Sequence, residues 1–171
     1  MAPTCLLSDA LWVSWMTDVE NRRSANTVPM QFTTNLPEIT ELLSLYASVG
    51  WNTYADEPEA LERAVRQSHF VLSARSEAGE LLGFVRTVSD DVSIMLVQTL
   101  AVRPEAQRLG IGRALMERVT TRYAHVTQHV LITKNQPHQL EFYASLGWHN
   151  TRDLVQDVTN CFYRNTRREL S

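Results

Sequence analysis

Two glycines two positions apart, Gly110 and Gly112, stand between an apolar run that ends at Val102 and an amphipathic run that follows. Glycines at a strand-to-helix junction let the backbone approach a ligand closely and direct its N–H groups outward. The start of a helix also carries roughly half a positive charge. Three arginines belong to the same stretch: Arg103, Arg108 and Arg113. Together these features predict a site for an anion with several oxygens, and a pyrophosphate fits best.

The spacing argues against two common phosphate-binding motifs. No Gly-Lys-Ser/Thr follows four spacer residues, so the loop is not a P-loop. A dinucleotide fingerprint needs a third glycine and an acidic residue ~20 positions later. Two interpretations stay open from spacing alone: the glycines contact a ligand, or they only let the helix pack tightly on the sheet.

Length and composition limit the class of protein. The chain has 171 residues, 44% hydrophobic and 20% charged, which suits one globular domain with a proper core. A net charge of −3 gives a nucleic-acid partner no electrostatic support. Two cysteines, Cys5 and Cys161, make no disulfide framework, so we expect reduced thiols and a cytoplasmic location. The sequence has no apolar run of about 18 residues, so we expect no membrane span, and its start does not resemble a secretory signal.

The elements that must position the glycine loop can be read from periodicity. Residues 1–24 carry a helical stripe and are predicted to form an N-terminal helical extension, followed by a single domain over 25–171. Strands are predicted at 27–33, 69–74, 81–88, in the run ending at 102, at 129–133, and as one or two closing strands within 154–163. Helices are predicted from 34 or 35 to 46, at 57–68, at 105–124 and at 139–146. Three consecutive strands with short turns predict an antiparallel meander, and the strand at 129–133 should lie parallel to the one ending at 102.

One hexapeptide occurs twice with a single conservative change. Tyr-Ala-Ser-Val-Gly-Trp spans 46–51, and Tyr-Ala-Ser-Leu-Gly-Trp spans 143–148. Nothing around the two copies matches, so they are not an internal repeat. We interpret both as the same way of ending a helix, with the glycine in the left-handed conformation.

The stretch from Val102 to Leu115, with its Gln107-Arg108-x-Gly110-Ile111-Gly112 core, resembles the acetyl-CoA signature of the GNAT superfamily of N-acetyltransferases. The resemblance covers roughly residues 32–164. It implies an α/β (α+β) fold with a mixed, mostly antiparallel central sheet of 6–7 strands flanked by helices. It also implies two splayed parallel strands that form the acetyl-CoA slot.

The resemblance implies acetyl-CoA (coenzyme A) as the cofactor and assigns a set of residues to it. The backbone amides of the glycine loop would hold the pyrophosphate, and the thioester would lie near the strand end. The cofactor-binding residues implied are Leu100, Ala101, Val102, Gln107, Arg108, Leu109, Gly110, Ile111, Gly112, Arg113, Asn135 and Tyr143.

The family also implies a general acid. Phe142-Tyr143 followed by Gly147-Trp148 matches the family's F-Y-x-x-x-G-F/W, so Tyr143 would protonate the departing thiolate. The alternative is a core aromatic at helical spacing. Relatives often carry an acidic base shortly before Val102, but this chain has Gln98 and Thr99 there.

The sequence indicates the binding site of the amine acceptor less clearly than the cofactor site. Trp51 and Tyr54, with Gln98 and Thr99, are the predicted substrate-binding residues, together with Arg86. Arg86 could instead pair with Asp90 or Asp91, and the sequence favours that pairing. No group of His, Cys, Asp and Glu has metal-ligand spacing, so no metal is predicted.

The resemblance therefore implies an N-acetyltransferase that transfers the acetyl group of acetyl-CoA to a primary amine of a small molecule, by direct attack in a ternary complex. One alternative is an acyl-CoA-binding sensor without turnover, and another is an enzyme that acts on a protein or peptide amine. The expected partner is the small amine, with neither nucleic acid nor membrane. Dimers are common in the family, so the resemblance also admits a homodimer.

Overall fold

The computed structural model describes residues 30–155 and 161–162, and the chain divides into two compact units, Met1–Val130 and Leu131–Ser171. The helix expected within 1–24 lies outside the described residues. The strands are β1 (Met30–Thr33), β2 (Phe70–Ser76), β3 (Leu81–Ser89), β4 (Ile94–Val102) and β5 (Gln128–Leu131). The α-helices are α2 (Ile39–Ser48), α3 (Pro58–Arg66), α4 (Ile111–Arg122) and α5 (Pro137–Ala144).

The five strands form one sheet in the order β1-β2-β3-β4-β5. The first four pair antiparallel in sequence order, as predicted. The Gln128 N–H donates to the Ser93 carbonyl at 3.0 Å, so β5 begins beside the beginning of β4. The two strands therefore run parallel, as expected of neighbours joined by a helix.

The strand count differs from the expected 6–7, although the α/β class and the mixed sheet are confirmed. In the part of the chain that the structure describes, no strand follows β5. Thr151–Asp153 form a 3-10 turn instead, and Val155 and Phe162 are 90% and 95% exposed. The other residues expected in closing strands, within 156–160 and at 163, lie outside the described residues.

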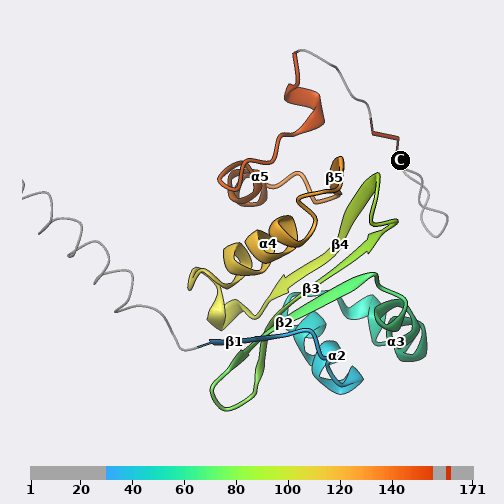
Figure 1. Ribbon diagram of the computed structural model, residues 1–171. Helices are drawn as coiled ribbons and strands as arrows, with labels where there is room; N and C mark the ends of the chain where they lie inside the picture. The colour runs from blue at the N-terminus through green and yellow to red at the C-terminus, as the bar shows by residue number, and fades with distance from the viewer. Residues whose placement is uncertain (1–29, 156–160, 163–171) are drawn as a thin grey trace, which may run out of the picture. The chain divides into compact units, whose positions relative to one another are not determined.

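Helices cover both faces of the sheet in the first unit. Figure 1 shows α4 on one face and α2 with α3 on the other. Buried side chains of α2, α3 and the strands form the core on the α2 side, including Leu45, Leu61 and Phe84. On the α4 side, a Cβ added at Gly83 would lie 2.8 Å from Ile111 Cγ2. The missing side chain at Gly83 therefore lets the first turn of α4 sit directly on β3.

Two helices start later than predicted, for local reasons. α2 begins at Ile39, because the Glu38 N–H donates to the Glu41 carboxylate at 3.0 Å and closes the first turn there. α4 begins at Ile111 rather than near 105. Pro104–Ala106 form a separate 3-10 turn, and Arg108 and Gly110 then adopt positive φ values of 63° and 83°, which no α-helix contains.

The two hexapeptides have the same helix-ending structure, as predicted. The Trp51 N–H donates to the Tyr46 carbonyl at 2.9 Å, and the Trp148 N–H donates to the Tyr143 carbonyl at 3.1 Å. Gly50 and Gly147 follow the last turn with φ values of 79° and 81°. The shared sequence thus closes α2 and α5 with the same six-to-one hydrogen bond and a left-handed glycine.

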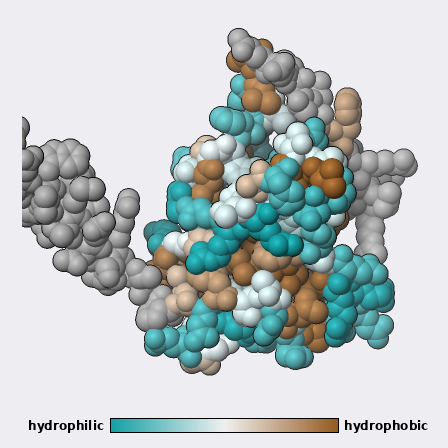
Figure 2. All heavy atoms as spheres, viewed as in Figure 1, coloured by the Kyte–Doolittle hydropathy of each residue, from teal (hydrophilic) through white to brown (hydrophobic). Residues whose placement is uncertain are grey.

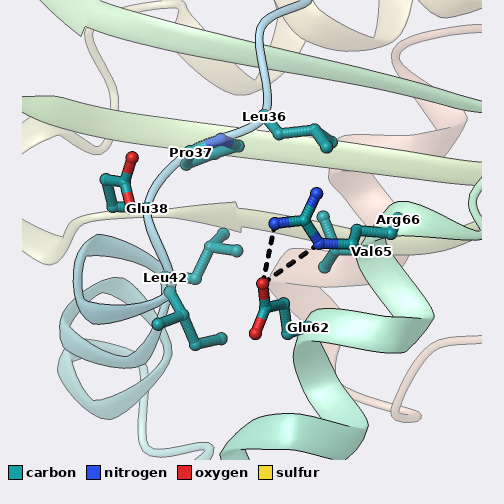
Figure 3. Close-up of a pocket in the computed structure, with 8 residues that line it drawn as sticks. Leu36, Pro37, Glu38, Leu42, Glu62, Val65 and Arg66 are labelled. Atoms are coloured by element: carbon teal, nitrogen blue, oxygen red, sulfur yellow. Dashed lines mark hydrogen bonds and ion pairs between the residues drawn. The ribbon is translucent and has the colours of Figure 1, made fainter.

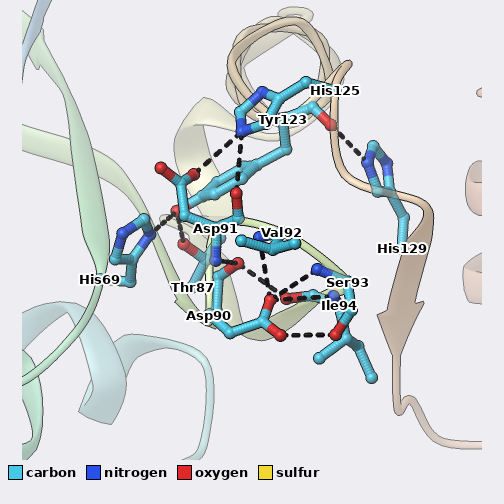
Figure 4. Close-up of polar contacts among 11 residues, drawn as sticks. His69, Thr87, Asp90, Asp91, Val92, Ser93, Ile94, Tyr123, His125 and His129 are labelled. Atoms are coloured by element: carbon cyan, nitrogen blue, oxygen red, sulfur yellow. Dashed lines mark hydrogen bonds and ion pairs between the residues drawn. The ribbon is translucent and has the colours of Figure 1, made fainter.

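The β3–β4 turn and the end of α4 carry a dense group of polar contacts (Figure 4). The Asp90 carboxylate accepts from the Ser93 hydroxyl and from the N–H groups of Val92, Ser93 and Ile94, and these hydrogen bonds lower its pKa. The Tyr123 hydroxyl lies 2.7 Å from His69 Nδ1 and 2.8 Å from Thr87 Oγ1. These contacts fix the hairpin and tie α4 to the sheet.

The face of the molecule in Figure 2 carries both hydrophilic and hydrophobic residues. Among the described residues, three exposed large apolar side chains lie in or beside the β3–β4 hairpin: Val88, Val92 and Ile94. No helix within residues 30–155 or 161–162 is long and apolar enough to cross a bilayer.

Candidate active site

The glycine loop lies directly after β4 and ends in the first turn of α4. Gly110 is the N-cap residue, with φ 83° and ψ −2°, and its carbonyl accepts the first helical hydrogen bond, from the Ala114 N–H at 2.9 Å. A Cβ at Gly110 would meet nothing within 4 Å, so the position faces open space. The first N–H groups of an α-helix have no acceptor within the helix. Those of Ile111 and Gly112 therefore provide donors for an anion.

The loop is held against the end of β4. The Gln107 Nε2 donates to the Val102 carbonyl at 3.1 Å, and buried Ala106 anchors the 3-10 turn between them. Because Gln107 uses its amide inside the loop, it fixes the loop's shape. The sequence identified Gln107 as a cofactor residue but gave no sign of this contact.

The three arginines of the loop have different environments. The Arg103 side chain turns back to β3 and α2, donating to the Leu81 carbonyl at 2.8 Å and to Ser44 Oγ at 3.0 Å. The Arg103 guanidinium therefore points away from the glycine loop. The prediction that Arg103 adds positive charge to the anion site is wrong. Arg113 pairs with Glu117 at 3.6 Å, and Arg108 is exposed with a positive φ.

A β-bulge in β4 separates the predicted acceptor residues from the start of the strand. Arg86 pairs with Thr99 and the next residue of β3, Thr87, pairs with Val97, so Gln98 is an extra residue. A bulge bends its strand and increases the local twist. Because β5 has four residues and starts beside Ser93, it accompanies only the first part of β4. No other described strand lies beside the remaining part, Gln98 to Val102, on that side of the sheet.

Thr99 and Arg86 lie on the α2 side of the sheet and contact one another. Thr99 is 4% exposed and Arg86 is 7% exposed. Arg86 Nε donates to Thr99 Oγ1 at 3.2 Å, and its Nη1 donates to Ser68 Oγ at 3.3 Å. The pairing of Arg86 with Asp90 or Asp91 is thus wrong, because strand alternation turns Arg86 toward α2 while Asp90 caps its own turn.

Trp51 and Tyr54 are partly buried and both pack on Tyr46. Their rings lie 5.3 Å and 5.0 Å from the Tyr46 ring, edge to face. Tyr46 itself is 1% exposed, and burial raises the pKa of its phenol, against the opposing influence of nearby Thr99 and Arg86. Sequence reasoning did not select Tyr46. The repeated hexapeptide was the available signal, because Tyr46 opens one copy as Tyr143 opens the other.

Tyr143 and Asn135 belong to the second unit. Tyr143 lies in α5, where its ring packs edge to face on Phe142 at 5.1 Å, and burial raises the pKa of its phenol. Asn135 lies in the exposed segment before α5. Thr133 Oγ1 donates to Gln139 Oε1 at 2.6 Å and links this segment to the helix.

A pocket between the start of α2 and the end of α3 contains none of the predicted site residues (Figure 3). Arg66 crosses it and donates from Nε and Nη2 to Glu62 Oε1, so its charge is paired. The described residues contain no group of three or more His, Cys, Asp and Glu side chains that could hold a metal ion.

Residues 46–162 match the family model of the acetyltransferase (GNAT) domain. The chain therefore belongs to the GNAT acetyltransferase family, as its glycine-loop signature indicated. This family places it among the acyltransferases.

Two curated proteins are similar over part of their length. Serotonin N-acetyltransferase 2, a chloroplastic protein of Oryza sativa subsp. japonica, is 31% identical over 130 residues, covering 74% of this chain and 63% of that protein. Peptidyl-lysine N-acetyltransferase YiaC of Escherichia coli is 43% identical over 86 residues, covering 48% of this chain and 53% of that protein. The chain thus spans less than two thirds of the length of each.

Solved structures show the same fold. The GNAT family protein SP0256 of Streptococcus pneumoniae TIGR4 has a TM-score of 0.67 and 28% identity, covering 81% of this chain and 98% of that chain. YhbS of Escherichia coli is a GNAT family N-acetyltransferase solved in complex with CoA. It has a TM-score of 0.57 and 17% identity, covering 71% of this chain and 69% of that chain.

Proposed function

We propose that this chain is an acetyl-CoA-dependent N-acetyltransferase that acts on a primary amine of a small molecule by direct attack in a ternary complex. The observation that carries the proposal is the loop held to the end of β4, with Gly110 capping α4 in a left-handed conformation that only glycine adopts without strain. That geometry presents helix N–H groups to an anion.

The loop residues fit a pyrophosphate. The N–H groups of Ile111 and Gly112 would donate to it, and exposed Arg108 would add charge. A Cβ at Gly110 would meet nothing within 4 Å, so no described side chain blocks the loop there. Leu109 and Arg113 complete the loop around it.

The end of β4 would hold the thioester arm. Leu100, Ala101 and Val102 lie in the part of β4 that no described strand accompanies on the β5 side. Backbone groups along such an edge can pair with the amides of an extended ligand. A strand N–H there would polarise the thioester carbonyl.

Acetyl-CoA supplies the acetyl group as a thioester, and the chain's own residues would manage the protons. Tyr143 would donate its phenolic proton to the departing sulfur. A phenol is protonated at neutral pH, as a general acid must be, and burial raises the pKa of Tyr143 further. Thr99 is buried and bonded to Arg86, and Gln98 has no acid–base function, so neither serves as a strong base. The amine would therefore react as its neutral fraction or lose its proton to water.

Trp51 and Tyr54 would form an aromatic wall for the acceptor, with Gln98, Thr99 and Arg86 across from it. A small amine is supported by the similarity to serotonin N-acetyltransferase 2. A protein lysine is the second candidate, supported by the 43% identity with a peptidyl-lysine N-acetyltransferase.

The first test is thermal unfolding of the full chain with acetyl-CoA, with ATP and dephospho-CoA as controls. Acetyl-CoA at ~100 times its Kd should stabilise the fold by about 2.7 kcal/mol, which raises Tm by roughly 5–10 °C. Thiol release is then followed with small amines and with lysine peptides. No rise in Tm would refute the cofactor assignment, and release with peptides alone would favour the second candidate.

A further inference from the structure

Arg86 is a buried arginine of β3 that pairs with no carboxylate of the described residues. It is 7% exposed, and its hydrogen bonds go to two neutral hydroxyls, those of Thr99 and Ser68. Within residues 30–155 and 161–162, no carboxylate lies within ion-pair distance of it. A buried charge is costly unless an opposite charge compensates it.

The chain pairs its other partly buried arginine of the sheet in the usual way. Arg75 of β2 donates from two nitrogens to both oxygens of Glu41, at 2.5 Å and 2.8 Å. Arg75 is the more exposed of the two, with a side-chain exposure of 20%. Arg86 is thus the more deeply buried of the two cations, and no described carboxylate pairs with it as Glu41 pairs with Arg75.

A second polar group beside Arg86, the Tyr46 hydroxyl, also has unused hydrogen-bonding capacity. The Tyr46 hydroxyl is buried and makes no hydrogen bond of ordinary geometry with the described residues, although Thr99 and Arg86 lie close enough to oppose the effect of burial on its pKa. Buried hydroxyls without a partner are uncommon in folded proteins. Tyr46 lies near Arg86 and Thr99, so an unsatisfied donor and an unpaired cation occur in one cluster, which consists of Tyr46, Ser68, Arg86 and Thr99.

The cluster lies between the two parts of the proposed acceptor site. On one side the rings of Trp51 and Tyr54 pack edge to face on the Tyr46 ring. On the other side Thr99 follows the bulged residue Gln98 and precedes Leu100 in β4. A ligand held between these parts would place its polar end at Arg86.

We propose that Arg86 recognises a carboxylate of the acceptor, so that the substrate class is a small primary amine that also carries a carboxylate. This proposal rests on the proposed acetyltransferase function. Thr99 and Ser68 hold the guanidinium by two of its N–H groups and leave others for the ligand, since a guanidinium has five. The positive charge of Arg86 also disfavours polyamine acceptors, which would bring like charge to the same place.

The test compares matched amines that differ only in the anionic group: 4-aminobutyrate with its amide, and phenylalanine with phenylalaninamide. Rates of thiol release are referred to the concentration of neutral amine, because the amide lowers the amine pKa. We expect kcat/KM to be on the order of 10- to 100-fold higher for the carboxylates, as one charge-assisted hydrogen bond provides.

Replacement of Arg86 should remove the preference. In Arg86→Gln the carboxylate-to-amide ratio should fall to near one, and in Arg86→Lys it should be partly kept, because the charge remains without the fork geometry. The control is Arg66→Gln, an exposed arginine of α3 paired with Glu62, which should keep the wild-type ratio. Acetyl-CoA stabilisation, measured for each variant, shows whether the fold and the cofactor site persist.

Each result decides the proposal. A wild-type ratio near one, or a ratio unchanged in Arg86→Gln, would overturn it. Failure to acetylate any of these amines while acetyl-CoA still stabilises the chain would overturn the acceptor class and leave the cofactor assignment standing. No stabilisation by acetyl-CoA would refute the proposed function itself.

Discussion

Replacement of Gly110 by alanine separates backbone strain from loss of the anion site. Gly110 has φ 83°, and a Cβ there would meet nothing within 4 Å, so the whole cost is conformational. An alanine in the left-handed region costs roughly 1–2 kcal/mol. For a chain of this size that lowers Tm by about 2–8 °C.

The strain can be relieved only where the loop enters α4. If the substituted alanine leaves the left-handed region, the first turn unwinds and the N–H groups of Ile111 and Gly112 change direction. We expect the Kd for acetyl-CoA to rise on the order of tenfold or more, the equivalent of one charge-assisted hydrogen bond. Gly110→Asn should recover most of the affinity, because asparagine tolerates this conformation.

Gly79 provides a matched control. It has φ 84°, also meets nothing within 4 Å, and lies in the β2–β3 turn outside the proposed site. Gly79→Ala should lower Tm by a similar amount and leave the Kd for acetyl-CoA unchanged, as measured by calorimetry. Equal Kd values for the two alanine variants would refute the assignment of the Gly110 turn to the coenzyme.

Three further predictions concern the core, the proposed acid and pH. Gly83→Ala should destabilise the fold by about 1–3 kcal/mol, measured by denaturant unfolding, because its Cβ would lie 2.8 Å from Ile111 Cγ2 in a packed core; an unchanged midpoint would mean that α4 can retreat from β3. Tyr143→Phe should lower kcat by roughly 100-fold or more while acetyl-CoA affinity is kept, and unaltered turnover would remove Tyr143 as the acid. Arg75 lowers the pKa of Glu41, so this pair stabilises the fold above the unfolded pKa of roughly 4.3 and loses that effect as the pH falls through the lower folded value. Glu41→Gln should cost about 1 kcal/mol at pH 7, and its difference from wild type should shrink on acidification; a constant difference would contradict the pairing.

The local pattern of the sequence determined the elements of the sheet and the helix endings. Alternation and turn residues identified β2 to β4, because a hairpin is defined by neighbours along the chain. The repeated hexapeptide predicted two identical helix ends for the same reason, since the backbone hydrogen bonds that close each end join residues at most five apart. The signature from Val102 to Leu115 located the glycine loop and the family.

Tertiary structure decided which polar groups meet. The sequence placed Arg86 four residues from Asp90 and favoured their pairing, but strand alternation and the β3–β4 register bring it to Thr99 and Ser68. The bulge at Gln98 left no sequence signal, because it depends on which residue of β3 lies opposite. Tyr46 likewise lies near Arg86 and Thr99 only because α2 packs on the sheet. Contacts between distant segments depend on register and packing, and single-sequence periodicity reports neither.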